Sequence, residues 1–168
     1  SIRYEHLYYS TLLSLLEKDA HLTNRQLAAM LGITEEEVAA KIATLEKNGV
    51  IKGYQTLIDW DKVDQHNIVA FIEVKVSPQR DFGFEQMAER MMRFEEVECV
   101  YLMSGGFGLA VTVRGQSFKD VALFVAERLA PLDNVLSCST HFILRKYKDN
   151  GVLFGAEQPD ERRKISLC

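Results

Sequence analysis

Three glycines lie within four residues of the stretch LMSGGFGLAVTV, which spans Leu102–Val113. Glycine-rich loops bind phosphate where they join a strand to a helix, because the helix N-terminus then holds the anion. Here the glycines are followed by LAVTV, whose composition predicts a second strand. The stretch is therefore not a phosphate loop. We expect a β-hairpin connection in which glycine supplies positive φ angles.

Histidines, cysteines and acidic residues form no catalytic or metal-binding pattern. The four histidines and three cysteines are scattered, without HExxH, HxH or CxxC spacing, so we expect no zinc site and no disulfide framework. No Ser–His–Asp arrangement or P-loop is present, and His141 is expected to pack locally in a sheet. These residues indicate a protein that needs no metal or cofactor, that is not an enzyme, and whose thiols are reduced as in the cytoplasm.

The composition, 47% hydrophobic and 26% charged, is typical of a soluble globular protein. No apolar run is long enough for a transmembrane helix, and the N-terminal residues lack a signal-peptide pattern. The net charge of −4 argues against a protein that coats nucleic acid, but it is compatible with a local basic face. Residues 1–60 contain six Lys or Arg and eight Asp or Glu, which gives a charge of −2.

Residues 1–60 are expected to form one domain built on three helices. Apolar residues recur at helical spacing and predict a first helix over Glu5–Lys18. Thr23 is a good N-cap for a second helix, Gln26 three residues later completes a capping box, and Gly32 ends this helix.

A third helix follows directly. It begins after Thr34, has Glu37 at the capping-box position and ends at Gly49. Two short helices joined by a glycine turn are the pattern of a helix-turn-helix. The next segment, GVIKGYQTLID, is predicted to form two short strands around Gly53, which would complete a winged helix-turn-helix DNA-binding domain.

Residues 61–67 have no periodic pattern and are expected to link this domain to a second one over residues 68–148. The second domain shows the order βαββαβ, which is typical of a ferredoxin-like fold, so the chain is predicted to be α+β. The expected elements are strand Ile68–Val76, helix Gly83–Phe94, strands Val97–Met103 and Leu109–Arg114, helix Ser117–Ala130 and strand Val135–Tyr147. Residues 149–168 are expected to be a C-terminal tail with a solvated basic ERRK stretch.

Both faces of the expected sheet carry apolar residues, whereas two helices can cover only one face. On the first strand, Ile68, Ala70, Ile72 and Val74 lie on one side, and Val69 and Phe71 on the other; on the last strand, Phe142 and Leu144 oppose His141 and Ile143. The simplest cover for the second face is another copy of the chain. We therefore expect a homo-oligomer.

Both domains resemble the Lrp/AsnC (leucine-responsive, feast/famine) family of transcriptional regulators. DAHLTNRQLAAMLGITEEEVAAKIATLEKNGVIKGY resembles the family's helix-turn-helix, EVECVYLMSGGFGLAVTV its second-domain motif, and STHFILRKYK its final strand. The resemblance covers about residues 10–148. It implies a regulator that binds promoter DNA, forms dimers and higher oligomers through the second domain, and responds to a small molecule, commonly an amino acid.

The third helix of the domain is the expected recognition helix, and its outward residues are candidates for DNA contact. Lysines can meet phosphate or guanine, alanine and threonine methyl groups can contact thymine, and a carboxylate can accept from cytosine N4. Three consecutive acids, Glu35–Glu37, also complement the helix dipole. The candidate DNA-binding residues are Thr23, Asn24, Arg25, Gln26, Thr34, Glu36, Ala40, Lys41, Thr44, Lys47 and Lys52.

The resemblance places the effector site in the glycine stretch, with Met103, Ser104, Gly105, Gly106, Phe107, Gly108 and Thr140 as candidates. The family motif is usually Gly–x–Tyr/Phe–Asp, and its carboxylate can engage the ammonium group of an amino acid. Gly108 stands at the position of that Asp. We therefore expect a ligand other than a simple α-amino acid, or a loop used only for assembly.

Two alternatives stay open from the residues. The acidic recognition helix is compatible with a ligand-sensing oligomer that has lost DNA binding and acts through a protein partner. Ferredoxin-like domains similar to this family also occur in sirohaem decarboxylases, for which His141, Arg145 and Lys146 would be the available groups.

Overall fold

The computed structural model describes residues 2–63, 67–77, 79–80 and 83–154, with side chains from Tyr9 onward. The chain forms two compact units that divide between Ile58 and Asp59. None of the helices in this described part combines the length and hydropathy that a membrane span requires. The ERRK stretch of the tail lies outside the described residues.

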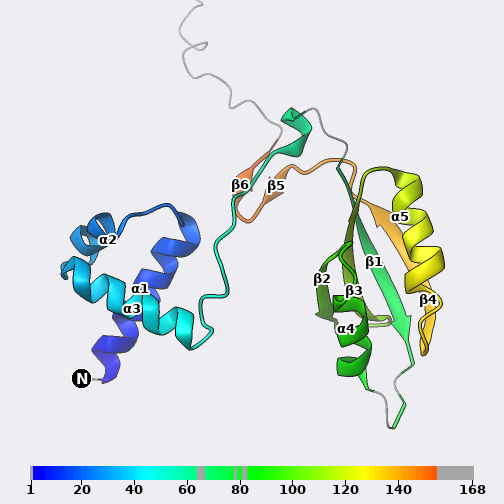
Figure 1. The fold of residues 1–168 in the computed structure, drawn as a ribbon, viewed down its shortest axis with the longest axis horizontal. Coiled ribbons are helices and arrows are strands. Elements are labelled where there is room, and N and C mark those ends of the chain that lie inside the picture. Colours follow the sequence, from blue (N-terminus) through cyan, green and yellow to red (C-terminus); the bar gives the residue numbers. More distant parts are fainter. Residues whose placement is uncertain (1, 64–66, 78, 81–82, 155–168) are drawn as a thin grey trace, which may run out of the picture. The chain divides into compact units, whose positions relative to one another are not determined.

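The N-terminal unit consists of three helices, α1 (Ile2–Lys18), α2 (Asn24–Leu31) and α3 (Glu35–Lys47) (Figure 1). The helices predicted from the capping boxes are confirmed, and α1 begins three residues earlier than expected. Gly32 adopts the left-handed conformation, with φ of 67°, that lets the chain turn from α2 into α3. The buried core of this unit consists of Leu12, Leu16, Leu27, Ala28, Val38 and Leu45.

The two short strands predicted around Gly53 are absent from the described chain, although the segment belongs to the predicted DNA-binding unit. The described chain has no strand between α3 and the short 3₁₀ turn η1 (Trp60–Lys62). A hairpin centred on Gly53 would need a chain reversal there, but Gly53 is not among the residues with positive φ. The segment therefore continues without pairing, and Tyr54 and Leu57 remain exposed.

The C-terminal unit is an antiparallel four-stranded sheet with the order β2-β3-β1-β4 (Figure 1). Its elements are β1 (Ile68–Val76), α4 (Phe84–Met92), β2 (Val97–Leu102), β3 (Gly108–Gly115), α5 (Phe118–Phe124) and β4 (Val135–Phe142). A π-helical turn, η2 (Val125–Leu129), continues α5. The predicted βαββαβ order and the α+β class are confirmed.

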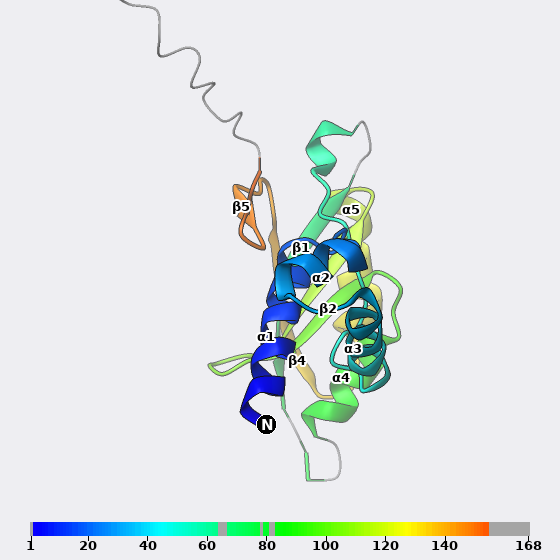
Figure 2. The ribbon, with the colours of Figure 1, turned by 90° about the vertical axis from the view of Figure 1, so that its left-hand side faces the viewer.

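Helices α4 and α5 cover one face of the sheet, and the core lies between them and the strands (Figure 2). The strands contribute small and branched residues, and the helices contribute methionine and phenylalanine. The buried members from these elements are Ala70, Ile72, Val74, Leu109, Val111, Val113, Met87, Met91, Val121 and Phe124. The alternation predicted for β1 is confirmed, because Ala70, Ile72 and Val74 face the core.

The opposite, open face of the sheet is more polar than expected. Val69 and Phe71 are half-buried, but Glu73 follows them on the same face of β1. The pairing register places His141 of β4 opposite Phe71, and the His141 Nε2 atom lies 3.6 Å from Glu73 Oε2 and 3.5 Å from Ser139 Oγ. The prediction that His141 packs locally within the sheet is confirmed.

The end of the described chain differs from the predicted long last strand and structureless tail. Strand β4 ends at Phe142, so the alternation assumed for residues 143 and 144 does not belong to a strand. A short hairpin follows, formed by β5 (Lys148–Asp149) and β6 (Val152–Leu153). Phe154 is buried, and its N–H donates to the carbonyl of Tyr147.

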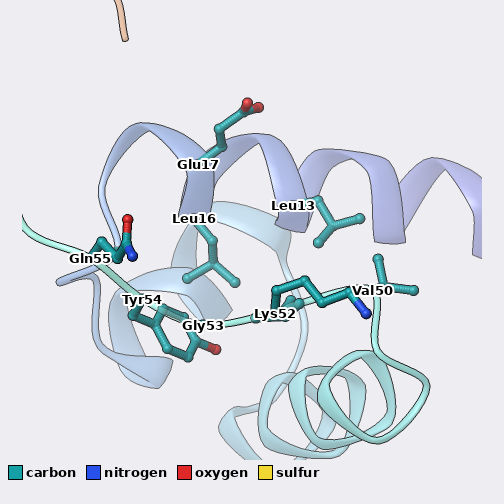
Figure 3. A pocket seen from close by; sticks show the side chains of 10 residues that line it. Leu13, Leu16, Glu17, Val50, Lys52, Gly53, Tyr54 and Gln55 are labelled. Carbon is teal, nitrogen blue, oxygen red and sulfur yellow. The ribbon is translucent and has the colours of Figure 1, made fainter. Parts of the chain in front are cut away.

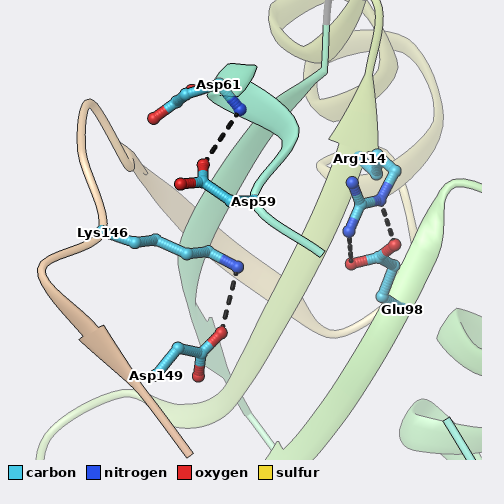
Figure 4. Close-up of polar contacts among 6 residues, drawn as sticks. All are labelled: Asp59, Asp61, Glu98, Arg114, Lys146 and Asp149. Atoms are coloured by element: carbon cyan, nitrogen blue, oxygen red, sulfur yellow. Dashed lines mark hydrogen bonds and ion pairs between the residues drawn. The ribbon is translucent and has the colours of Figure 1, made fainter. Parts of the chain in front are cut away.

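Ion pairs stabilise two exposed parts of this unit (Figure 4). Lys146 Nζ lies 3.1 Å from Asp149 Oδ2 beside the terminal hairpin. On β3, the Arg114 guanidinium donates two hydrogen bonds to the carboxylate of Glu98, which lies at the register shift between Val97 and Cys99 in β2. Asp59 accepts from the N–H of Asp61 at 3.2 Å and caps η1.

Candidate DNA-binding and effector-binding sites

The capping boxes engage several of the predicted DNA-binding residues. Thr23 Oγ1 accepts from the N–H of Gln26 at 3.1 Å, and Gln26 Oε1 accepts from the N–H of Thr23 at 2.9 Å. Thr34 and Glu37 form the same pair at the start of α3, at 3.1 and 2.9 Å. These side chains position the helix ends, whereas Asn24 and Arg25 remain exposed on the first turn of α2.

The outward face of α3 is opposite the buried residues Val38 and Leu45. Glu36, Ala40, Thr44 and Lys47 of the predicted set are all exposed there. Ala43 is exposed on the same face and was missed, although its spacing of seven residues from Glu36 is a signal that places it there.

Two candidates on α3 have intramolecular partners instead of free polar groups. The Thr44 hydroxyl donates to the carbonyl of Ala40 at 3.0 Å, which leaves its methyl group as the outward part. Lys41 is half-buried, and its Nζ lies 4.6 Å from the centre of the Tyr9 ring on α1. Lys41 therefore sits on the flank of the helix in a cation–π contact.

Lys52 lies on the segment after α3, beside a cleft formed with the C-terminal half of α1 (Figure 3). Its Nζ lies over Gly49, 3.3 Å from the position that a Cβ atom would take there. Leu13 and Leu16 line the cleft from α1, and Tyr54 from the following segment. Partial burial raises the pKa of the Tyr54 phenol, and the Glu46 carboxylate raises it further.

The glycine stretch forms the predicted hairpin connection between β2 and β3. The N–H of Met103 donates to the carbonyl of Gly108 at 2.8 Å and closes the loop. The carbonyl of Phe107 accepts from the N–H of Val76 at 3.1 Å, which ties the loop to the end of β1. Ser104, Gly105 and Gly106 are exposed at the tip.

Positive φ angles occur at two of the three glycines, Gly105 at 119° and Gly108 at 106°. Gly108 is also closely packed, because an added Cβ atom would lie 2.8 Å from Val76 Cγ2 and 3.0 Å from Phe84 Cε1. A carboxylate side chain at position 108 therefore conflicts both with the backbone conformation and with its neighbours.

Thr140 does not join the loop within one chain. Thr140 lies on β4 and pairs with Ile72 of β1. Gly108 lies on β3 and pairs with Lys75 on the other side of β1. Three residues of strand separate these positions, which corresponds to about 10 Å along β1. The other six candidates, Met103 to Gly108, are contiguous.

Comparison with known protein families assigns both units. The winged helix-turn-helix DNA-binding model matches residues 11–52, and the Lrp/AsnC ligand binding domain model matches residues 69–153. The first match contains α2 and α3, and the second contains the sheet and the glycine loop.

Related proteins match over most of their length. The HTH-type transcriptional regulator YugG of Bacillus subtilis is 47% identical over 92% of this chain and 94% of its own. LrpA of Pyrococcus horikoshii is 29% identical over 82% of this chain and 94% of its own. A transcriptional regulator from Neisseria meningitidis, crystallised in complex with L-methionine, shares the fold with a TM-score of 0.69 at 20% identity, over 84% of this chain and 91% of that one.

The two family matches follow each other in the order of the two units, and the relatives extend through both. A helix-turn-helix joined to a ligand-binding domain binds DNA and a small-molecule effector. This combination is that of a regulator and not of an enzyme. The chain belongs to the Lrp/AsnC family and is a DNA-binding transcriptional regulator.

Proposed function

We propose that this regulator acts in the cytoplasm as a homo-oligomer that binds double-stranded promoter DNA through several weak helix-turn-helix contacts at once. The observation that carries the proposal is the charge of the DNA-binding unit, which has six basic and eight acidic residues in residues 1–60. Phosphate neutralisation supplies most non-specific affinity, so one unit alone binds weakly. Linked copies raise the overall affinity by converting later contacts into intramolecular ones.

Exposed basic side chains on this unit support specific phosphate contacts. Arg25 stands on the first turn of α2, Lys47 on the last turn of α3 and Lys52 on the segment that follows. Among the described residues, the side chains of Arg25 and Lys47 take part in no side-chain hydrogen bond and no ion pair. We assign the phosphate contacts to these three residues.

The open face of the sheet supports assembly through the C-terminal unit. Phe71 and Val69 are only half-buried in a single chain, and Tyr101 on the same face of β2 is 54% exposed. A second copy packed on this face would cover these side chains and enclose the Glu73–His141 pair.

For the effector we propose a ligand other than a simple α-amino acid, held by the loop from Met103 to Gly108. The solved Neisseria regulator binds L-methionine, and a carboxylate in the loop suits an ammonium group. Here position 108 is a glycine in a tightly packed left-handed conformation, so that partner is missing. Ser104, Gly105 and Gly106 are exposed, and backbone N–H groups of such a loop favour an anionic group on the ligand.

The DNA-binding proposal is tested by measuring affinity for a promoter fragment at several salt concentrations. Simultaneous replacement of Arg25, Lys47 and Lys52 by alanine is expected to weaken DNA binding strongly. It should also reduce the slope of log affinity against log salt by about three, because three phosphate contacts are lost. The matched control replaces Lys62, Lys75 and Lys119, which are exposed on the other unit. Unchanged affinity of the first variant would overturn the assignment.

The effector proposal is tested by a thermal-shift screen with the twenty amino acids and with carboxylic acids that lack an amino group. A ligand bound only by the native state raises the melting temperature. We expect shifts from the second set, and their loss in Gly106→Trp, which fills the loop. Tight binding of a standard amino acid that Gly106→Trp abolishes would contradict the proposal.

A second candidate function is that of a ligand sensor that acts through a protein partner, which the three acids Glu35–Glu37 favour. A gel shift with the promoter of its own gene separates the two functions. Retardation at low salt supports the DNA-binding regulator, and no retardation at any salt concentration supports the sensor.

A further inference from the structure

Several polar side chains of α3 and its N-cap already have a partner within the described chain. Thr34 and Glu37 are engaged in the capping box, Thr44 bonds to the carbonyl of Ala40, and Lys41 lies over Tyr9. On the outward face of α3, in the described part of the chain, the side chains of Glu36 and Lys47 take part in no side-chain hydrogen bond and no ion pair.

These two free groups stand at opposite ends of the same face. Glu36 lies in the first turn of α3, Lys47 in the last, and Ala40 and Ala43 between them at spacings of four and seven residues from Glu36. The N-terminal residues of a recognition helix meet base edges, whereas later residues approach the backbone. The position that reads bases by hydrogen bonding is therefore occupied by a carboxylate.

A carboxylate can only accept hydrogen bonds, and this limits which bases it tolerates. In the major groove, guanine presents the acceptors O6 and N7, and thymine presents the acceptor O4. Neither base therefore offers a hydrogen-bond donor to a carboxylate. Cytosine presents the N4 amino group as its only polar atom there. Methyl groups such as those of Ala40 and Ala43 in turn pack against the C5 methyl of thymine.

We propose that Glu36 is a specificity-determining residue that accepts a hydrogen bond from cytosine N4 in each half-site, next to thymine methyl groups that pack on Ala40 and Ala43. The inference rests on the proposed DNA-binding function of α3. The family match establishes DNA as the ligand, and the free carboxylate selects the base.

The helix dipole alone does not account for Glu36. An acid anywhere in the first turn interacts favourably with the helix N-terminus, and Glu35 and Glu37 already supply that charge. A purely electrostatic role on the helix predicts no change in base preference when Glu36 is replaced. A reading role predicts a specific change, so the two differ in a measurable way.

The test is a selection of binding sites from randomised duplexes with the full-length protein, followed by competition measurements. Replacing the selected cytosine is expected to weaken wild-type binding about tenfold, as for one lost base contact. In Glu36→Gln the preference is expected to move to adenine, because an amide pairs with adenine N6 and N7. Glu46→Gln is the matched control, since it removes the same charge from α3 on the side that acts on Tyr54.

A second measurement replaces the neighbouring thymines by uracil, which removes only the methyl group. We expect a loss of several-fold in wild-type affinity. Cytosine preference retained by Glu36→Gln, or DNA binding that shows no cytosine preference, would overturn the inference while leaving the DNA-binding function intact. No binding to any duplex at low salt would overturn the proposed function and the inference with it.

Discussion

The two functional surfaces of this regulator are built in opposite ways. The DNA-facing surface lies on helices whose ends are closed by side chains, as in the Thr34–Glu37 box. The loop proposed to hold the effector is made largely of backbone, and at Gly108 a side chain would have no space. The comparison teaches that the first surface depends on which side chains are present, whereas the second depends on side chains being absent.

The largest expected effect concerns the core beneath each surface. Leu12 is fully buried among six buried core residues in the N-terminal unit, against twelve in the C-terminal unit. Leu12→Ala is expected to destabilise its unit by about 3 kcal/mol, and therefore to abolish DNA binding while the sheet remains folded. Hydrogen exchange resolved by peptide checks this, with exposed Leu57→Ala as the control. Equally faster hydrogen exchange in both units would contradict the prediction that the sheet stays folded when the N-terminal unit is destabilised.

Adding one methyl group to the loop is the next largest change. Gly108→Ala combines a left-handed φ with contacts below 3.1 Å to Val76 and Phe84, so we expect a loss of about 2 kcal/mol in the C-terminal unit. Gly106→Ala is the matched control, because nothing lies within 4 Å of its added Cβ and its φ is not positive. Urea unfolding measures both, and similar losses would refute the role of packing at position 108.

Removing a cap tests whether side chains support the DNA-facing surface. Thr34→Ala loses the hydroxyl that accepts from the N–H of Glu37, and it is expected to cost about 1 kcal/mol. Thr34→Ser keeps the hydroxyl and should retain most of this free energy. Thermal unfolding followed by circular dichroism compares the two variants. Equal destabilisation by both would show that the lost free energy does not come from the hydroxyl cap.

The smallest expected effect is a difference between the two lysines of α3 in the salt dependence of DNA binding. Lys47→Ala is expected to reduce the slope of log affinity against log salt by about 1, since one phosphate contact is lost. Lys41→Ala should leave that slope unchanged and lower stability by about 0.5–1 kcal/mol, because its ammonium faces Tyr9. Filter-binding titrations at several salt concentrations measure the slopes. A reduced slope for Lys41→Ala would mean that Tyr9 does not hold this charge away from DNA.

Features that depend on a few neighbouring residues were predictable from the sequence. Both capping boxes, the turn at Gly32 and the hairpin at Gly105 follow from residues within a few positions of one another. The strand and helix order of the C-terminal unit followed from alternation and helical stripes, because one face of each element is buried.

Features that depend on distant partners were not predictable. The contact between Lys41 and Tyr9 could not be predicted, because helical spacing alone does not reveal a ring on another helix, and Lys41 stays a predicted DNA contact. The distance of Thr140 from the loop within one chain depends on the strand register, which the sequence does not reveal. Two strands were expected around Gly53, but the segment after α3 forms none, and Gly53 does not adopt a positive φ. The buried Phe154 had no periodic context to mark it.

The three loop glycines differ in how far they can be exchanged. Gly108 is restricted by its φ and by its neighbours, and Gly105 by its φ alone, while Gly106 has neither restriction. Position 106 is thus the one glycine of this loop at which evolution or protein engineering can introduce new side chains at little conformational cost. New ligand preferences in this scaffold are most readily reached through that single position.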